Sequence, residues 1–600
     1  MLYNNLIFFL VAIFVFSTHT PADKPLLPPV WTFVFLGIAL ASYAIAAKRV
    51  FAGAVGSKGY FAAEKRLSLL AALLFAGFVY LLDIKYYLAP LSFKGAMPVI
   101  TDIAGLACFF ILLGIMWSKG RVQYGRLFHR HYSSAAFVAA NFKINLPVVL
   151  PWLMVSLLFD LLRILPFSQL QQLLRSPWGD GLLFVLFIVV LTLLFPPLVR
   201  SLWGCRPLPP GPLSNHIGRL CAGQAFRVEV LLWPLFEGQV LTAAIMGIVP
   251  GLRYLLLTPA LIETLTSEEL DSVIAHEIGH VKRLHLVLYI ALFLGFSLFA
   301  GAVTALLPHY VLLGDLYYTI LAILPVAPET VLALFVSAPV LALLLIYFRY
   351  IFGFFIRNFE RQADLHVFQV QGTSAAIISS FEKIASLSDG EREGKNWHHF
   401  GIGERIRFLE SCERDRSLLA RHDRKLRSGL LVYFAVVCLL SFGLHQIDTE
   451  QLIARYEVKY TEAVLMQKVR LDPENSKLLT FLGDFLQSRD LEKRAVAAYE
   501  KALTLDPDNP EVNNNLAWLL LTAKDASLHD AARALELAKK AVREKEQGAI
   551  LDTLATAYWA TGQPYMAIEL ELKAAALDPK NRGYYQAQID RFKKTKWRDS

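Results

Sequence analysis

Long apolar runs that could form membrane-spanning helices recur along most of the chain. A helix needs about 20 apolar residues to cross the hydrocarbon core of a bilayer, so each such run bounded by charges or proline is a candidate span. The candidates lie at residues 3–18, 30–47, 68–88, 99–117, 147–165, 182–203, 286–308, 331–356 and 429–445. The first is short. This pattern predicts a polytopic helical membrane protein with about six spans before residue 204.

Composition and charge agree with a membrane protein. The 600 residues are 55% hydrophobic and 18% charged, with a mean hydropathy of +0.45. The net charge of +9 could suggest a nucleic-acid partner, but the basic residues gather in alternate loops, at 48–66 after the second run and at 119–143 after the fourth. Such loops are cytoplasmic under the positive-inside rule. We therefore expect a multi-pass protein, as in a bacterial inner membrane, and no nucleic-acid partner.

A segment of soluble composition follows the sixth run. The proline-rich stretch Arg206–Pro212 opens it, and it continues to about residue 284. Within it, Phe226–Trp233 and Leu252–Thr258 are apolar, partly β-branched or aromatic runs set off by Pro and Gly, which predicts short strands. Thr266 then fits the N-cap of a helix, with Glu269 three positions on as in a capping box. We expect a small α+β module here.

The predicted helix carries the sequence His276-Glu277-Ile278-Gly279-His280. Histidines four positions apart on a helix project from one face, about 5–6 Å apart, so both can bind one metal ion. Zinc lowers the pKa of a bound water towards roughly 7, and Glu277 could then accept its proton during attack on a peptide carbonyl. This is the H-E-x-x-H arrangement of zinc peptidases, and it predicts one Zn²⁺ per chain.

A third ligand is expected from beyond the next two spans. The segment Arg357–Asp364 continues helically from the run at 331–356, and Glu360 and Asp364 share one face of it. Two spans return the chain to the side that it left, so Glu360 can complete a His₂Glu site with an open position for water. Asp364 could orient a ligand histidine. Alone, either carboxylate would be read as a solvated charge at a helix end.

His285 follows the motif closely, but its spacing differs from that of a known ligand pattern. In H-E-x-x-H-x-x-G-x-x-H the third histidine is a ligand, whereas here Arg283 replaces the glycine and His285 falls one residue short. We therefore predict that His285 lies at the membrane interface and binds no metal.

Together these motifs resemble HtpX and the type I CAAX prenyl endopeptidases, which are membrane zinc metallopeptidases. The resemblance rests on H-E-x-x-H, two spans, and then E-x-x-A-D at residues 360–364, and it covers about residues 215–410. It implies the same chemistry for His276, Glu277, His280 and Glu360, with Asp364 beside the ligands.

The resemblance also implies substrate-binding residues. Thr242–Gly247 matches the family's substrate-edge motif Asn-Ala-x-x-x-Gly, with Thr in place of Asn, so Ala243 and Gly247 are candidate contacts for a substrate strand. His399 and Arg405 echo a downstream H-P-x-x-x-x-R-I element, although Phe400 replaces the proline. A polypeptide substrate is expected to pair with this edge through its backbone.

The last 150 residues contain a repeat. Leu-Asp-Pro at 471–473 recurs 34 residues later at 505–507 and again at 577–579, 72 residues further on. Leu-Gly at 482–483 aligns with Leu-Ala at 516–517 and 554–555, small residues where two helices approach closely, and extra residues fall near 523–530. A 34-residue helical-hairpin period resembles the tetratricopeptide repeat, which forms an α-solenoid. A protein partner is expected to bind it.

The expected layout has four parts. They are an N-terminal membrane region at 1–203, a metallopeptidase domain at 204–427 with inserted spans at 286–308 and 331–356, a ninth span at 428–446, and repeats at 450–600. If the ninth run crosses, the active site is cytoplasmic and the repeats lie on the opposite side. If it packs without crossing, they share the catalytic side.

Three functions compete. The first is an integral-membrane zinc endopeptidase that cleaves membrane or misfolded proteins, with repeats that recruit substrate or partner. The second is a catalytically idle membrane scaffold that binds partners through its repeats, against which stand the intact motif residues. The third is a transporter, which the scarcity of charged residues within the spans disfavours. The sequence favours the peptidase.

Overall fold

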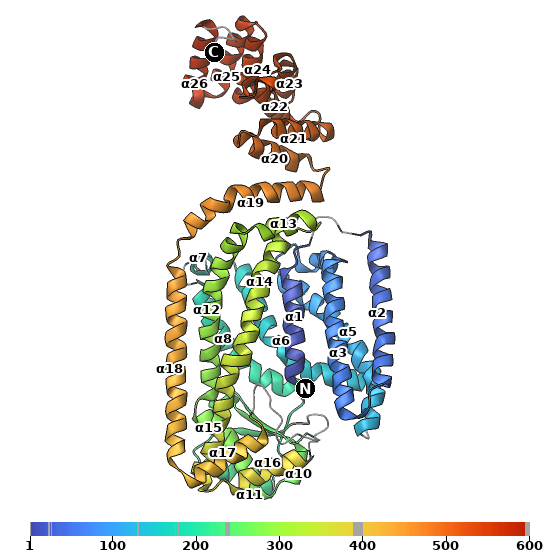
Figure 1. The fold of residues 1–600 in the computed structure, drawn as a ribbon, viewed down its shortest axis with the longest axis vertical. Coiled ribbons are helices and arrows are strands. Elements are labelled where there is room, and N and C mark those ends of the chain that lie inside the picture. Colours follow the sequence, from blue (N-terminus) through green and yellow to red (C-terminus); the bar gives the residue numbers. More distant parts are fainter. Residues whose placement is uncertain are drawn as a thin grey trace. The chain divides into compact units, whose positions relative to one another are not determined.

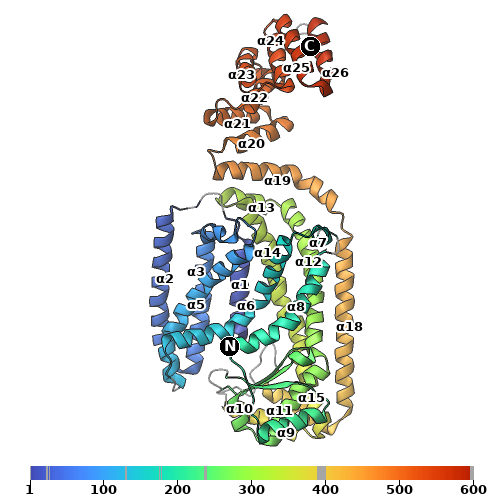
Figure 2. The same ribbon diagram turned by 180° about the vertical axis from the view of Figure 1, so that it is seen from behind.

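The computed structural model describes residues 2–21, 25, 27–128, 131–174, 176, 179–234, 240–387 and 400–594. The chain divides into two compact units, Met1–Leu307 with Ala333–Ile447, and Pro308–Leu332 with Asp448–Ser600. Figures 1 and 2 show the elements of each unit from opposite sides. The polytopic helical fold with a small sheet and C-terminal helical repeats is confirmed.

Each predicted apolar run is largely helical, although the third is divided between two helices and the eighth contains a π-helical turn. Seven helical stretches of the described residues are long and apolar enough to cross a membrane: α2 (Pro29–Ala52), α5 (Pro98–Phe128), α6 (Ser134–Ile164), α8 (Gly179–Leu202), α12 (His285–Leu313), Pro328–Gln371 and α18 (Ser417–His445). An eighth is α3 (Gly56–Tyr80) with the following Ile84–Ser92, which bend by 73° at residues 81–83. The first run forms a shorter apolar helix, α1 (Leu2–Thr18).

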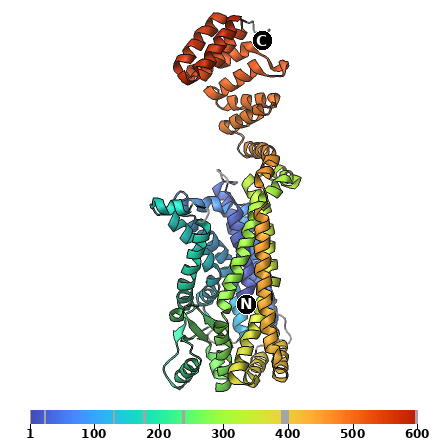
Figure 3. The same ribbon diagram turned by 90° about the vertical axis from the view of Figure 1, so that its left-hand side faces the viewer.

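The stretch Pro328–Gln371 leads from the membrane into the candidate site. It consists of α14 (Pro328–Ile346), one π-helical turn η4 (Tyr347–Phe352) and α15 (Gly353–Gln371). The Tyr347 and Tyr433 hydroxyls both donate to the Leu292 carbonyl, at 2.8 and 2.7 Å, and so join η4 and α18 to α12. Figure 3 shows long helices of this unit running side by side.

A four-stranded sheet lies next to the helices of the candidate site. Its strands are β1 (Arg206–Pro207), β2 (Glu229–Leu232), β3 (Ala243–Met246) and β4 (Tyr254–Leu257), in the order β1-β2-β4-β3. β2 and β4 pair in parallel, whereas β3 pairs with β4 in the antiparallel direction, Ala243 opposite Leu257. β2 and β4 lie within the two predicted runs. The third strand, β3, is an edge of the sheet.

The predicted helix start at Thr266 is confirmed. Thr266 is the N-cap of α11 (Ser267–Lys282), its backbone N–H donates to Glu269 Oε2 at 2.8 Å, and its hydroxyl accepts from the Glu269 N–H at 3.4 Å. Glu269 also accepts bonds from Ser379 Oγ and Lys383 Nζ of α16 (Ala375–Leu387), at 2.6 and 2.7 Å. The capping residue therefore ties α16 to the start of the motif helix.

Replacing Glu269 with Gln should destabilise the peptidase domain in a pH-dependent way. Burial raises the pKa of Glu269, but the bonds from Lys383, Ser379 and the Thr266 backbone outweigh it and lower the pKa to about 2. A carboxylate with a lowered folded-state pKa stabilises the fold above its unfolded pKa of about 4.3, and this contribution is lost as the pH falls towards 2. We expect a loss of about 2 kcal/mol at pH 7 that shrinks between about pH 5 and pH 2. Thermal unfolding of both forms across this range measures it, and an equal difference at every pH would contradict the pKa argument.

The second unit contains the helical repeats. Its hairpins are α20 (Ser476–Ser488) with α21 (Glu492–Leu505), α22 (Pro510–Thr522) with α23 (Ala531–Glu544), and α24 (Gly548–Ala560) with α25 (Pro564–Leu577), followed by α26 (Arg582–Lys594). A Cβ on Gly483 would lie 2.4 Å from the Tyr499 ring, which explains the small residue there. The extra residues at 523–530 form the longer α22–α23 connection, with the short helix η5 (Ala526–Leu528). Both details agree with the sequence prediction.

A further helix in this unit joins the repeats to the connection between two spans. α19 (Thr449–Leu471) contacts α13 (Asp315–Ile323), which follows α12. The Gln467 side-chain amide donates to the Leu324 and Val326 carbonyls at 2.7 and 3.1 Å, and Tyr456 bonds His309 at 2.8 Å. The start of the repeat region is therefore bound to the connection that separates α12 from α14.

Candidate active site

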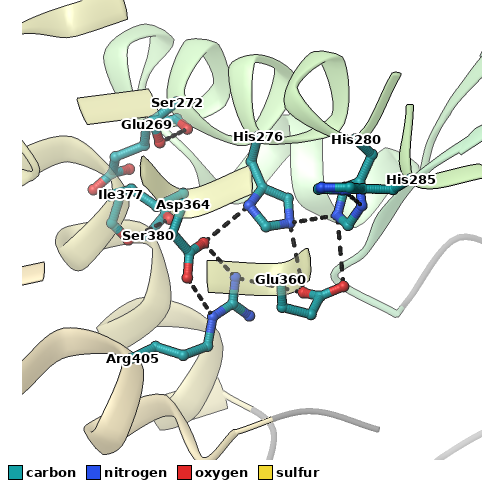
Figure 4. Close-up of polar contacts among 10 residues, drawn as sticks. All are labelled: Glu269, Ser272, His276, His280, His285, Glu360, Asp364, Ile377, Ser380 and Arg405. Atoms are coloured by element: carbon teal, nitrogen blue, oxygen red, sulfur yellow. Dashed lines mark hydrogen bonds and ion pairs between the residues drawn. The ribbon is translucent and has the colours of Figure 1, made fainter. Parts of the chain in front are cut away.

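Three side chains from two helices converge at one point (Figure 4). The Nε2 atoms of His276 and His280, both on α11, lie 3.3 Å apart. Glu360 on α15 places Oε2 3.7 Å from His276 Nε2 and Oε1 3.5 Å from His280 Nε2. The ligand atoms of all three residues lie within 4.8 Å of one another, and all three residues are buried.

Close packing of α11 on α15 brings these residues together. A Cβ on Gly279 would lie 2.9 Å from the His366 Cβ and 3.2 Å from the Ala363 Cα, so the motif's glycine and the small Ala363 let the two helices approach. Gly279 lies one residue before His280, and Ala363 lies three residues after Glu360. The same contact that packs the helices therefore sets the distance between the imidazoles and the carboxylate.

The donor set fits a zinc ion. Two imidazole nitrogens and one carboxylate are the ligands of catalytic His₂Glu zinc sites, which keep a fourth position open for water. Burial lowers the pKa of His276, but Asp364 and Glu360 outweigh it and raise the pKa to about 10. The carboxylates that favour a proton on His276 equally favour a metal cation in its place. For His280, burial prevails and lowers the pKa to about 3, so this imidazole is neutral and ready to bind.

Asp364 contacts His276 on the side away from the cluster, and Arg405 in turn binds Asp364. Asp364 Oδ1 lies 2.9 Å from Nδ1 of His276, the nitrogen that faces away from the cluster. Arg405 on α17 (Ile402–Arg414) donates to both carboxylate oxygens of Asp364, through Nε at 2.9 Å and Nη2 at 2.6 Å, and its Nη2 also lies 3.7 Å from Oε2 of Glu360. Burial lowers the pKa of Arg405, but Asp364 outweighs it and raises it. Its guanidinium is thus engaged by Asp364 and not presented to solvent.

Glu277 lies between the cluster and the edge strand. Its surroundings raise the pKa of this carboxyl through burial, whereas His276 and a hydrogen bond from the Ile245 backbone act in the opposite direction. Ile245 belongs to β3, so the carboxylate touches the middle of the edge strand. Glu277 is partly exposed, whereas His276 and His280 on either side of it in the motif are buried.

The two candidate substrate contacts lie at the ends of this strand. Ala243 begins β3, and Gly247 follows it with φ +96°. A Cβ on Gly247 would lie 2.1 Å from the Leu252 carbonyl oxygen, so both the conformation and the space require glycine. The structure describes no strand beyond β3 on its open edge. His399, the remaining candidate, lies outside the described residues.

Sequence reasoning missed one residue of the site. His285 is fully buried, and its Nδ1 lies 3.0 Å from Nδ1 of His280. His285 begins α12, the next candidate span, and its atoms do not join the three-residue cluster, so neither part of its prediction is contradicted. What the sequence did not indicate is its contact with His280. Its position three residues beyond the end of α11 was the available signal, because a tight turn can bring such a residue back onto the last helical turn.

A membrane-spanning helical protein with a buried His₂Glu cluster and a carboxylate at an edge strand belongs to the class of membrane metallopeptidases. Residues 235–413 match the family model described as Peptidase family M48. Residues 498–536 match a tetratricopeptide repeat model, which confirms the repeat type.

Comparisons with whole proteins add no further assignment. No curated protein matches the chain. Among solved structures, the crystal structure of S. mikatae Ste24p shares 16% identity, covers 64% of this chain and 100% of its own, and has a TM-score of 0.32.

Proposed function

We propose that this protein is an integral-membrane zinc-dependent endopeptidase that cleaves membrane or misfolded proteins. The observation that carries the proposal is the convergence of His276, His280 and Glu360 on one point with Glu277 directly beside them. An M48 domain around these residues supports it. One zinc ion per chain is proposed, held by these three side chains.

Zinc bound there would polarise the scissile carbonyl and make a water molecule nucleophilic near neutral pH. Glu277 accepts the proton of the attacking water and passes it to the leaving amine. A carboxyl whose pKa is raised by burial suits both steps, because a general acid–base works best when its pKa is close to the working pH. Asp364 fixes the His276 ring through Nδ1 and leaves Nε2 for the ion.

The substrate is proposed to add to the sheet as a further strand. β3 offers an unpaired edge between Ala243 and Gly247, and an extended polypeptide can pair with such an edge through its backbone. The Ile245 backbone is among the groups that affect the pKa of Glu277, which supports a substrate strand that pairs next to the general base. Backbone pairing does not depend on side chains, so we propose broad sequence specificity and a requirement for an extended, unfolded segment.

The resemblance to the family suggested that His399 and Arg405 bind the substrate. The two bonds from Arg405 to Asp364 support a different role, in which Arg405 holds Asp364 against His276. We therefore propose Arg405 as a positioning residue, while substrate contact by His399 remains a prediction.

The location of each part is also a proposal. If the short α1 crosses together with the five longer candidates before residue 204, six spans and the basic loops support a cytoplasmic peptidase domain. α12 leads from the candidate site at His285 across the membrane to the connection that precedes α14. α19 contacts this connection, which supports a crossing by α18 to the same side. We propose a bacterial inner-membrane protein whose active site is cytoplasmic and whose repeats bind a protein partner on the opposite side.

The proposal is tested by incubating the detergent-purified protein with a loosely folded protein and mapping the products by mass spectrometry. We expect internal cuts at many sites, lost on chelation of zinc and restored when zinc is added back. Cuts that persist without metal would refute the zinc mechanism. An intact substrate, despite one bound zinc per chain, would favour the idle scaffold, whose supporting observation is the extended repeat unit.

A further inference from the structure

His285 lies where a second support for the metal ligands would be needed. Its Nδ1 is 3.0 Å from Nδ1 of His280, and its Nε2 is 3.0 Å from Oε1 of Gln362 (Figure 4 shows the two histidines). The ring also stacks on Phe359, with centroids 4.5 Å apart and planes at 16°. Each polar atom and one face of this ring therefore has a defined partner.

The proton positions along these contacts follow from the cluster. Nε2 of His280 faces His276 and Glu360, so a metal held there takes the lone pair of Nε2 and the proton must sit on Nδ1. Nδ1–H then donates to His285, which must accept through its unprotonated Nδ1 and carry its own proton on Nε2. That proton is donated to Gln362 Oε1. Only one arrangement of protons satisfies both contacts.

The contacts continue to a charged pair. The Gln362 amide nitrogen donates to Asp423 Oδ1 at 2.5 Å, and Arg283 Nη1 donates to Asp423 Oδ2 at 3.1 Å. An amide can accept through its oxygen only if its nitrogen points the other way, and Asp423 fixes that orientation. Donation therefore runs in one direction from His280 through His285 and Gln362 to Asp423, which also accepts from Arg283.

The backbone is arranged to bring His285 back to the motif. α11 ends at Lys282, and Leu284 adopts φ +58°, a left-handed conformation that is costly for a residue with a Cβ. The turn reverses the chain so that α12 begins at His285. Strained backbone of this kind persists only where the surrounding contacts fix it, and here those contacts are the ones to His280, Gln362 and Phe359.

We propose that His285 is a positioning residue for zinc binding, which holds His280 in the ligating tautomer as Asp364 does for His276. The inference rests on the proposed zinc function. It also distinguishes the two ligands: His276 is backed by a carboxylate, whereas His280 is backed by a neutral imidazole that orients the ring without adding negative charge next to the ion. Partners of this kind typically contribute 10- to 100-fold to metal affinity.

The test measures zinc affinity of the purified full chain by competition with a chromophoric chelator. His285→Phe keeps a ring to stack on Phe359 but removes the acceptor, and should weaken zinc binding roughly 10- to 100-fold. His285→Asn places an oxygen near the former Nδ1, and should stay within about threefold of the wild type if accepting from His280 is what matters. His445→Phe, which changes an exposed histidine at the end of α18, is the matched control.

A second variant keeps the test decisive if His285→Phe fails to fold. Gln362→Met preserves volume but leaves the Nε2–H of His285 without its acceptor, so zinc affinity should fall several-fold. Wild-type affinity in His285→Phe, or in Gln362→Met when His285→Phe is unfolded, would overturn the role of His285 while the proposed function stands. A wild-type protein that binds no zinc would overturn both.

Discussion

Glu277→Gln is expected to reduce kcat/KM for peptide cleavage roughly 1000-fold while leaving bound zinc unchanged. The carboxamide has the size of the carboxylate but cannot accept a proton, and proton transfer by a positioned side chain contributes about 100- to 10,000-fold. Glu277 is not one of the three clustered ligand residues, so the metal site should remain intact. Steady-state cleavage of a quenched fluorescent peptide, with zinc determined on the same sample, measures both quantities.

Glu268→Gln is the matched control for this variant. It makes the same chemical change on the same helix, at an exposed position in the first turn. Its activity should equal that of the wild type. Substantial activity in Glu277→Gln with full zinc occupancy would mean that another group takes the proton, and the assignment of the general base would be wrong.

Glu360→Gln should weaken zinc binding at least about 100-fold and abolish cleavage at limiting zinc. It removes the only negatively charged member of the cluster, and loss of a direct ligand should cost more than loss of an outer partner, which costs 10- to 100-fold. Equilibrium dialysis against buffered zinc gives the affinity, with Glu268→Gln again as control. Unchanged zinc affinity would show that Glu360 is not a ligand.

The elements that carry the chemistry could be read from the sequence because their signals are local. The capping residues Thr266 and Glu269 define the start of α11, and helical spacing places His276 and His280 on one face. Glu360 could be placed near them because an even number of spans returns the chain to the same side of the membrane. That argument needs only counting and hydropathy, both of which a single sequence supplies.

Contacts between distant segments could not be read in the same way. Arg405 reaches Asp364 across 41 residues, and Gln362 reaches His285 across 77. The contact of His285 with His280 depends on the left-handed Leu284, and no glycine or asparagine at that position indicated such a turn. A ligand pattern tests only for metal contact, so it overlooked a histidine that contacts another histidine.

Two irregularities within the predicted spans could not be predicted from the sequence either. The third apolar run bends by 73° where Asp83 adopts φ +45°, although neither glycine nor proline occupies residues 81–83. The π-helical turn at Tyr347–Phe352 likewise interrupts an apolar run without a sequence signal. Such turns often occur next to functional sites, and this one ends eight residues before Glu360. Tertiary packing, including the bond from Tyr347 to Leu292, fixes its position.

Titration of the metal-free protein with zinc tests the central claim most directly. The protein is stripped with a chelator, zinc is added back in steps, and cleavage of a loosely folded protein is measured at each step. The proposed site predicts no cleavage without metal, a linear rise in activity, and a plateau at one zinc per chain. Cleavage by the metal-free protein, or no cleavage at one bound zinc per chain, would contradict the assignment of His276, His280 and Glu360 as a catalytic zinc site.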